Sequence, residues 1–62
     1  MYQYKVKYAN FKEHGQEFWT VVTISENHND EEALINALQK VISREERTLP
    51  KEIVVLQVAP MQ

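Results

Sequence analysis

The sequence predicts a small α+β domain, in which a three-stranded sheet is packed on one face by a single helix and is extended by dimerisation. Three observations indicate this fold class. A sustained helical period runs from Asp30 to Arg47, the stretches on both sides of it have the composition of strands, and the chain has only 62 residues and no cysteine. The order strand, strand, helix, strand makes one β-β-α-β domain over residues 1–62.

The first two predicted strands form a hairpin. From Tyr2 to Tyr8, aromatic and β-branched residues alternate with Gln and Lys, as in a strand with one buried face. Residues 10–16 interrupt this pattern with polar residues and Gly15, which takes positive φ at little cost. Residues 17–25 are rich in β-branched and aromatic residues and are apolar on both faces, which is typical of a strand inside a sheet.

The predicted helix has a wider apolar face than one small sheet requires. Asn29 or Asp30 can cap its first turn, and Pro50 prevents it from continuing. A helix on one sheet needs an apolar stripe of about 100° or somewhat more. At about 100° per residue, the apolar side chains here span about 200°. These are Ala33, Leu34, Ile35, Ala37, Leu38, Val41 and Ile42. We expect the excess at the flanks, Ile35 and Ile42.

The third predicted strand covers residues 52–58 and raises the question of strand order. The polar outer face of the first strand favours an edge position, whereas the other two strands are apolar on both faces. Order 1-2-3 is therefore favoured over 2-1-3. The third strand would then be an open apolar edge, which pairing with a second copy would close. In this arrangement Trp19, Val21, Ile53 and Val55 lie on the face opposite the helix.

Composition argues against enzymatic chemistry. His14 and His28 lie in predicted polar loops without a ligand spacing, and Ser25 and Ser43 are outside any nucleophile motif. One glycine is too few for a phosphate-binding loop. We predict no catalytic residue, no metal and no cofactor. The absence of cysteine and of an apolar targeting or spanning segment indicates a cytoplasmic protein that does not contact membranes.

The apolar surface left uncovered is the main functional indication. It predicts a small binding or regulatory module that acts through protein–protein interaction as a homodimer, or with a different, unidentified protein. The predicted interaction residues are Trp19, Val21, Ile35, Ile42, Ile53 and Val55.

An alternative is a nucleic-acid-binding sheet face, with lysines for phosphates and one aromatic ring for stacking. It would use Lys5, Lys7, Lys12 and Trp19. The formal net charge of −2 makes nucleic acid the weaker of the two partners.

The pattern Glu31-Glu32-Ala33-Leu34 followed by Ala37-Leu38 resembles the strand-then-helix opening of HicB-type antitoxins. This is the pattern of a generic amphipathic helix, so the resemblance assigns no role to any residue.

Overall fold

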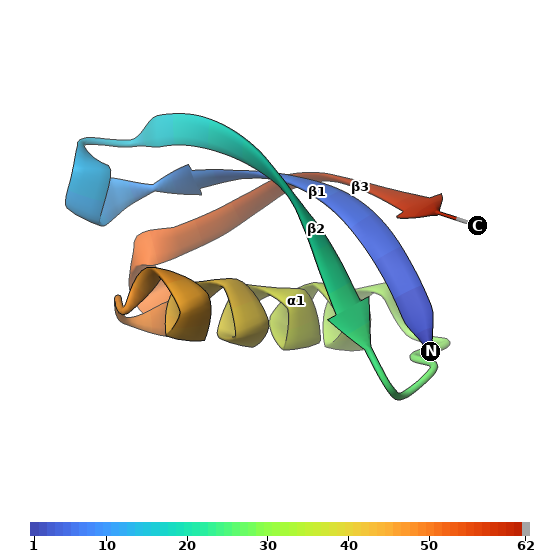
Figure 1. Cartoon of the computed structure of the whole chain (residues 1–62). Helices are drawn as coiled ribbons and strands as arrows, with labels where there is room; N and C mark the ends of the chain where they lie inside the picture. The colour runs from blue at the N-terminus through green and yellow to red at the C-terminus, as the bar shows by residue number, and fades with distance from the viewer. Residues whose placement is uncertain (62) are drawn as a thin grey trace.

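The computed structural model describes residues 1–61 and contains one three-stranded antiparallel sheet and one long helix (Figure 1). The strands are β1 (Tyr2–Asn10), β2 (Gln16–Ile24) and β3 (Ile53–Met61), and the helix is α1 (Glu31–Glu46). Two short 3-10 turns, η1 (Phe11–Glu13) and η2 (Pro50–Glu52), complete the connections. The predicted small α+β fold is confirmed.

The turns and the helix ends have local causes, of which the sequence predicted Gly15 and the cap at Asp30. His14 and Gly15 both take positive φ between β1 and β2, and the Asn10 side chain accepts a hydrogen bond from the Lys12 N–H. Asp30 caps α1 by accepting a hydrogen bond from the Glu32 N–H. Arg47 ends the helix in a left-handed conformation, and its N–H donates to the Arg44 carbonyl.

The strand order is β2-β1-β3, so the favoured order 1-2-3 is wrong. β1 lies at the centre and pairs antiparallel with both neighbours. Its polar side chains, Lys5 and Lys7, lie beside the exposed Trp19 ring, on the face opposite the core residues Val6 and Tyr8 and therefore opposite α1. Alternation of polar and apolar residues shows only that one face of a strand is exposed to solvent. In a sheet covered by a helix on one face, this is true of a central strand as well as of an edge strand.

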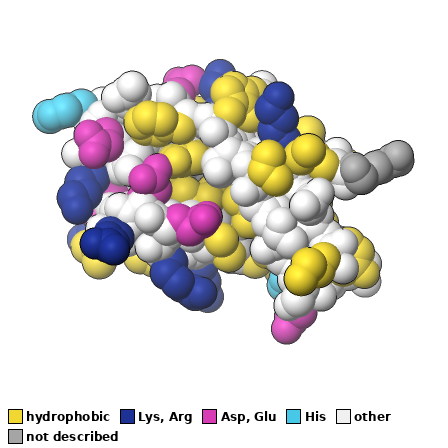
Figure 2. All heavy atoms as spheres, viewed as in Figure 1, with side chains coloured by type: hydrophobic (Ala, Val, Ile, Leu, Met, Phe, Trp, Pro, Cys, Tyr) yellow, Lys and Arg dark blue, Asp and Glu magenta, His cyan; other side chains and the backbone are white. Residues whose placement is uncertain are grey.

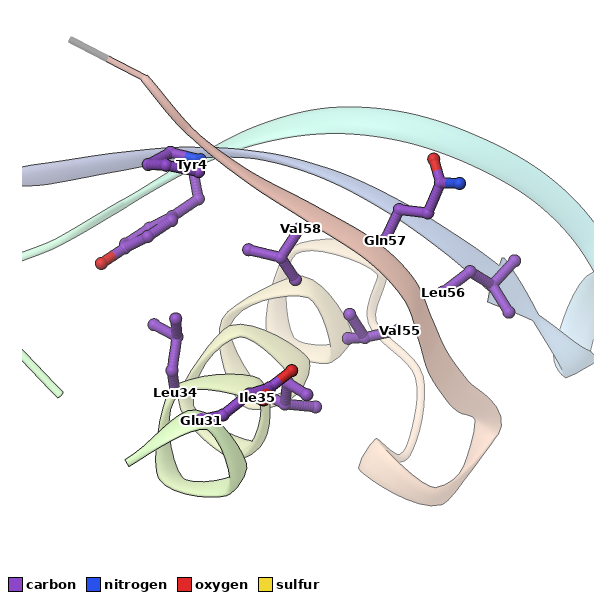
Figure 3. A pocket seen from close by; sticks show the side chains of 9 residues that line it. Tyr4, Glu31, Leu34, Ile35, Val55, Leu56, Gln57 and Val58 are labelled. Atoms are coloured by element: carbon purple, nitrogen blue, oxygen red, sulfur yellow. The ribbon is translucent and has the colours of Figure 1, made fainter. Parts of the chain in front are cut away.

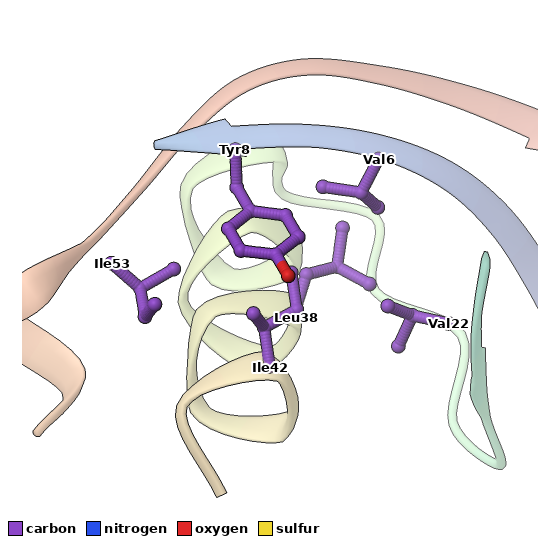
Figure 4. Packing of buried hydrophobic residues seen from close by; sticks show 6 residues of the cluster. All are labelled: Val6, Tyr8, Val22, Leu38, Ile42 and Ile53. Atoms are coloured by element: carbon purple, nitrogen blue, oxygen red, sulfur yellow. The ribbon is translucent and has the colours of Figure 1, made fainter. Parts of the chain in front are cut away.

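The core lies between α1 and one face of the sheet (Figure 4). Its buried cluster draws on all three strands and the helix: Val6, Tyr8, Val22, Leu38, Ile42 and Ile53. Ile42 was expected at the exposed flank of the helix, and this prediction is wrong, because Ile42 points into the centre of the cluster. The helical wheel is therefore rotated relative to the expectation, with Leu38 and Ile42 at its buried centre.

An irregularity in β3 reverses the expected facing of its first residues. Lys7 of β1 lies opposite Gln57 and Tyr8 lies opposite Val55, which leaves Leu56 as an extra residue. Ile53 and Val55 therefore face α1, and the prediction that they lie on the uncovered face is wrong. Ile53 is 1% exposed, whereas Val54 is 41% exposed. Beyond the extra residue the alternation shifts by one.

Candidate functional site: a groove beside β3 and an open sheet face

A groove of about 430 Å³ lies between β3 and the first half of α1 (Figure 3). We call it the β3–α1 groove. Its apolar lining includes Tyr4, Leu34, Ile35, Val55, Val58 and Pro60. The side chains of Val55 and Val58 point into it from the strand, while Leu56 and Gln57 point away from it. Glu31 adds one carboxylate to the lining.

Local structure explains why this groove is open. The extra residue at Leu56 allows Val55 and Val58, three positions apart, to lie on the same side of β3. The strand then rises away from α1 toward its C-terminal end (Figure 1). Ile35 lies on this flank of the helix and is only half-buried, whereas Leu38, one turn further along, is fully buried in the core. The groove is the part of the helix–sheet interface that the two elements leave unfilled.

The second candidate surface is the sheet face away from α1, which we call the open face, with Lys5, Lys7, Trp19 and Val21 at its centre. Trp19 lies opposite Lys7, and Val21 lies opposite Lys5 in the β1–β2 pair. Trp19 is 51% exposed and Val21 is 49% exposed. The structure thus brings an exposed indole ring and two lysines together, as the nucleic-acid alternative requires.

The charged groups of the open face interact with other residues of that face. The Lys5 ammonium lies 5.1 Å from the centroid of the Trp19 ring, and the Lys7 ammonium lies 6.0 Å from it. Lys7 also forms an ion pair with Glu17 at 3.1 Å. A base stacking on this ring would compete with two ammonium groups, and the glutamate offsets one of the two positive charges.

Lys12 does not join this surface. It lies in η1, at the end of the hairpin, and its ammonium donates a hydrogen bond of 3.4 Å to the Arg47 carbonyl at the end of α1. The four residues of the nucleic-acid prediction are therefore divided between the open face and the helix end. Figure 2 shows charged side chains of both signs gathered at that end of the molecule.

The six predicted interaction residues fall in three places. Trp19 and Val21 lie on the open face, and Ile35 and Val55 line the β3–α1 groove. The remaining two, Ile42 and Ile53, belong to the core. Sequence reasoning missed the groove residues Tyr4, Leu34 and Val58, because the favoured strand order kept β3 away from Tyr4 of β1, which β3 adjoins in the structure.

One polar contact anchors the end of α1 to the sheet. The Tyr8 hydroxyl donates a hydrogen bond to the Glu46 carboxylate. Burial, followed by that carboxylate and the nearby charge of Glu45, raises the pKa of Tyr8 well above its usual range. The phenol is therefore held in its protonated, donating form, which suits a structural tether.

The remaining polar candidates are dispersed. His14 is exposed in the hairpin loop, and His28 lines a shallow hollow of about 250 Å³ together with Glu26 and Val41. Within residues 1–61, no three His, Asp or Glu side chains gather as a group that could hold a metal ion. Over the same residues, no helix has the length and apolarity needed to cross a membrane.

Comparison of the chain with protein-family models, with curated proteins and with solved structures finds no match. The geometry of the two surfaces is therefore the basis for assigning a function.

Proposed function

We propose that this protein is a small non-enzymatic binding module that acts through protein–protein interaction as a homodimer, and that the β3–α1 groove with the adjoining edge of β3 is its interaction surface. The observation that carries the proposal is the position of an apolar groove directly beside an edge strand without charged residues. Such an edge and groove can accept a further strand together with its side chains.

The small size of the core supports this proposal. Six side chains form the buried cluster of a chain without disulfides, and domains of this length often gain stability by oligomerisation.

Sedimentation equilibrium of the whole chain over micromolar to millimolar concentration tests the proposal. An edge contact along a molecule whose longest dimension is 31 Å would bury less than the ~800 Å² per partner of a standard interface. We therefore expect a reversible dimer that dissociates on dilution. A monomer over the whole range, with no concentration dependence, would contradict the homodimer.

Nucleic-acid binding on the open face is the second candidate, because Lys5, Lys7 and Trp19 do lie together there. Titration with a single-stranded oligonucleotide tests it through the fluorescence of Trp19, the sole tryptophan. Quenching that weakens with added salt would support this candidate. Unchanged fluorescence would leave the groove as the better supported surface.

A further inference from the structure

The free edge of β3 has unusual features for an exposed strand. β3 pairs with β1 along one side and forms one border of the sheet. Residues 53–61 include no charged side chain, although edge strands are commonly protected by charges. The edge therefore offers backbone N–H and C=O groups next to apolar side chains.

Pro60 limits the part of this edge that can pair. Proline has no N–H, so within a ladder it lies where that group would point away from the neighbouring strand. Pro60 lies opposite Tyr4 of β1, which places its missing donor on the free edge. At the other end, Ile53 is already bonded within the chain, because its N–H donates to the Pro50 carbonyl and its carbonyl accepts from the Gln39 side chain. Residues 54–58, with the extra residue Leu56 at their middle, remain available to pair.

The charges at the two ends of β3 favour a second copy in antiparallel orientation. Lys51 is exposed immediately before the strand, whereas the carboxylate of the next residue, Glu52, accepts hydrogen bonds from the Thr48 hydroxyl and the Leu49 N–H. Glu31 lines the groove beside the later part of β3. α1 and β3 run in opposite directions (Figure 1). Antiparallel pairing of two β3 strands turns the Lys51 end of each copy toward the Glu31 end of the other, whereas parallel pairing would bring like charges together.

We infer that the free edge of β3 pairs with the β3 edge of a second copy, in antiparallel orientation, to form one continuous six-stranded sheet. This inference rests on the proposed homodimer and assigns its interface. A two-fold axis perpendicular to the sheet relates the copies, so both α1 helices lie on the same face. Ile35 of each copy then flanks the joined strands, which accounts for an isoleucine left half-buried in the monomer.

Matched charge substitutions on the two edge strands test the assignment. Leu56 is 44% exposed on β3, and Val21 is similarly exposed on β2. We expect Leu56→Lys to weaken dimerisation about tenfold or more, because it sets two charges close to the two-fold axis. Val21→Lys should leave the dissociation constant unchanged. Sedimentation equilibrium gives both constants, and circular dichroism establishes that both variants are folded.

Single cysteines give an independent readout, because the 62-residue sequence contains none. Under mild oxidation, Leu56→Cys should form a disulfide-linked dimer, since Leu56 is the middle residue of the segment 54–58 and therefore lies near the two-fold axis of an antiparallel pair. Val21→Cys, on the opposite edge, should remain monomeric on a non-reducing gel. This pair decides the question if either lysine variant fails to fold.

The outcomes separate the interface from the homodimer itself. A wild-type chain that is monomeric at every concentration overturns both the homodimer and the β3 interface. A wild-type dimer that survives Leu56→Lys, or that cross-links through Val21→Cys instead of Leu56→Cys, overturns the β3 interface and leaves the homodimer standing.

Discussion

The open face and the β3–α1 groove both expose apolar side chains, but they differ in whether the polar groups beside those side chains already have interaction partners. On the open face, Trp19 is covered in part by two ammonium groups, and one of these is paired with Glu17. In the groove, the apolar wall ends at a strand edge with free backbone groups. Exposed apolar area alone does not identify an interaction surface; unsatisfied groups beside it are the stronger indication.

The largest effect is expected for substitutions in β3, and it tests which side chains of this strand face α1. Ile53→Ala should lower the free energy of unfolding by about 2–5 kcal/mol, because Ile53 belongs to the buried cluster. Val54→Ala, one residue along, should lower it by less than about 0.5 kcal/mol. Urea denaturation measures both. Equal effects would show that β3 does not face the core as described.

The next largest effect tests whether the groove takes part in self-association. Ile35→Glu places a carboxylate on the apolar flank near Glu31, and we expect it to weaken self-association about tenfold or more while the fold persists. Val21→Glu on the open face is the matched control. If Ile35→Glu leaves both folding and assembly unchanged, the groove is not part of the interface.

A smaller effect concerns the anchor between α1 and the sheet. Tyr8→Phe removes the hydrogen bond to Glu46 and should lower the free energy of unfolding by about 1–2 kcal/mol. Thermal denaturation of the two proteins at neutral pH measures this difference. An unchanged midpoint would show that the hydroxyl contributes nothing to stability.

The same tyrosine predicts a pH dependence. Because the pKa of Tyr8 is raised in the folded state, its contribution is fully present below the ordinary tyrosine pKa of about 10 and is lost as the pH rises above it. Wild-type stability should fall there more steeply than that of Tyr8→Phe. Parallel curves for the two proteins would count against the raised pKa.

The smallest effect is expected on the open face. Lys5→Met keeps much of the side-chain length and removes the ammonium group over the Trp19 ring. It should cost about 0.5–1 kcal/mol and shift the tryptophan emission. Unchanged emission would mean that Lys5 does not remain over the ring in solution, and the open face would then be more available for stacking.

Local signals in the sequence predicted the elements well. Asp30 and Arg47 bracket the helix as the pattern indicated, and the hairpin turns at His14 and Gly15. These features depend on capping and backbone preferences of neighbouring residues, which a sequence carries directly.

Strand order and the groove could not be predicted in the same way. The polar residues Lys5 and Lys7 indicate an uncovered face without telling an edge strand from a central one. The run Ile53-Val54-Val55-Leu56 is apolar throughout, so its pattern does not reveal which residues face α1. The extra residue at Leu56 determines which side chains of β3 face α1, and it arises from the pairing of β3 with β1.

Amide hydrogen exchange as a function of protein concentration tests the central claim most directly, because it compares the two edge strands within one molecule. We predict that the amides of β3 between residues 54 and 58 gain protection as concentration rises, while those of β2 do not change. Protection gained by β2 instead, or concentration-independent exchange in both strands, would contradict the assignment of the interaction surface to β3.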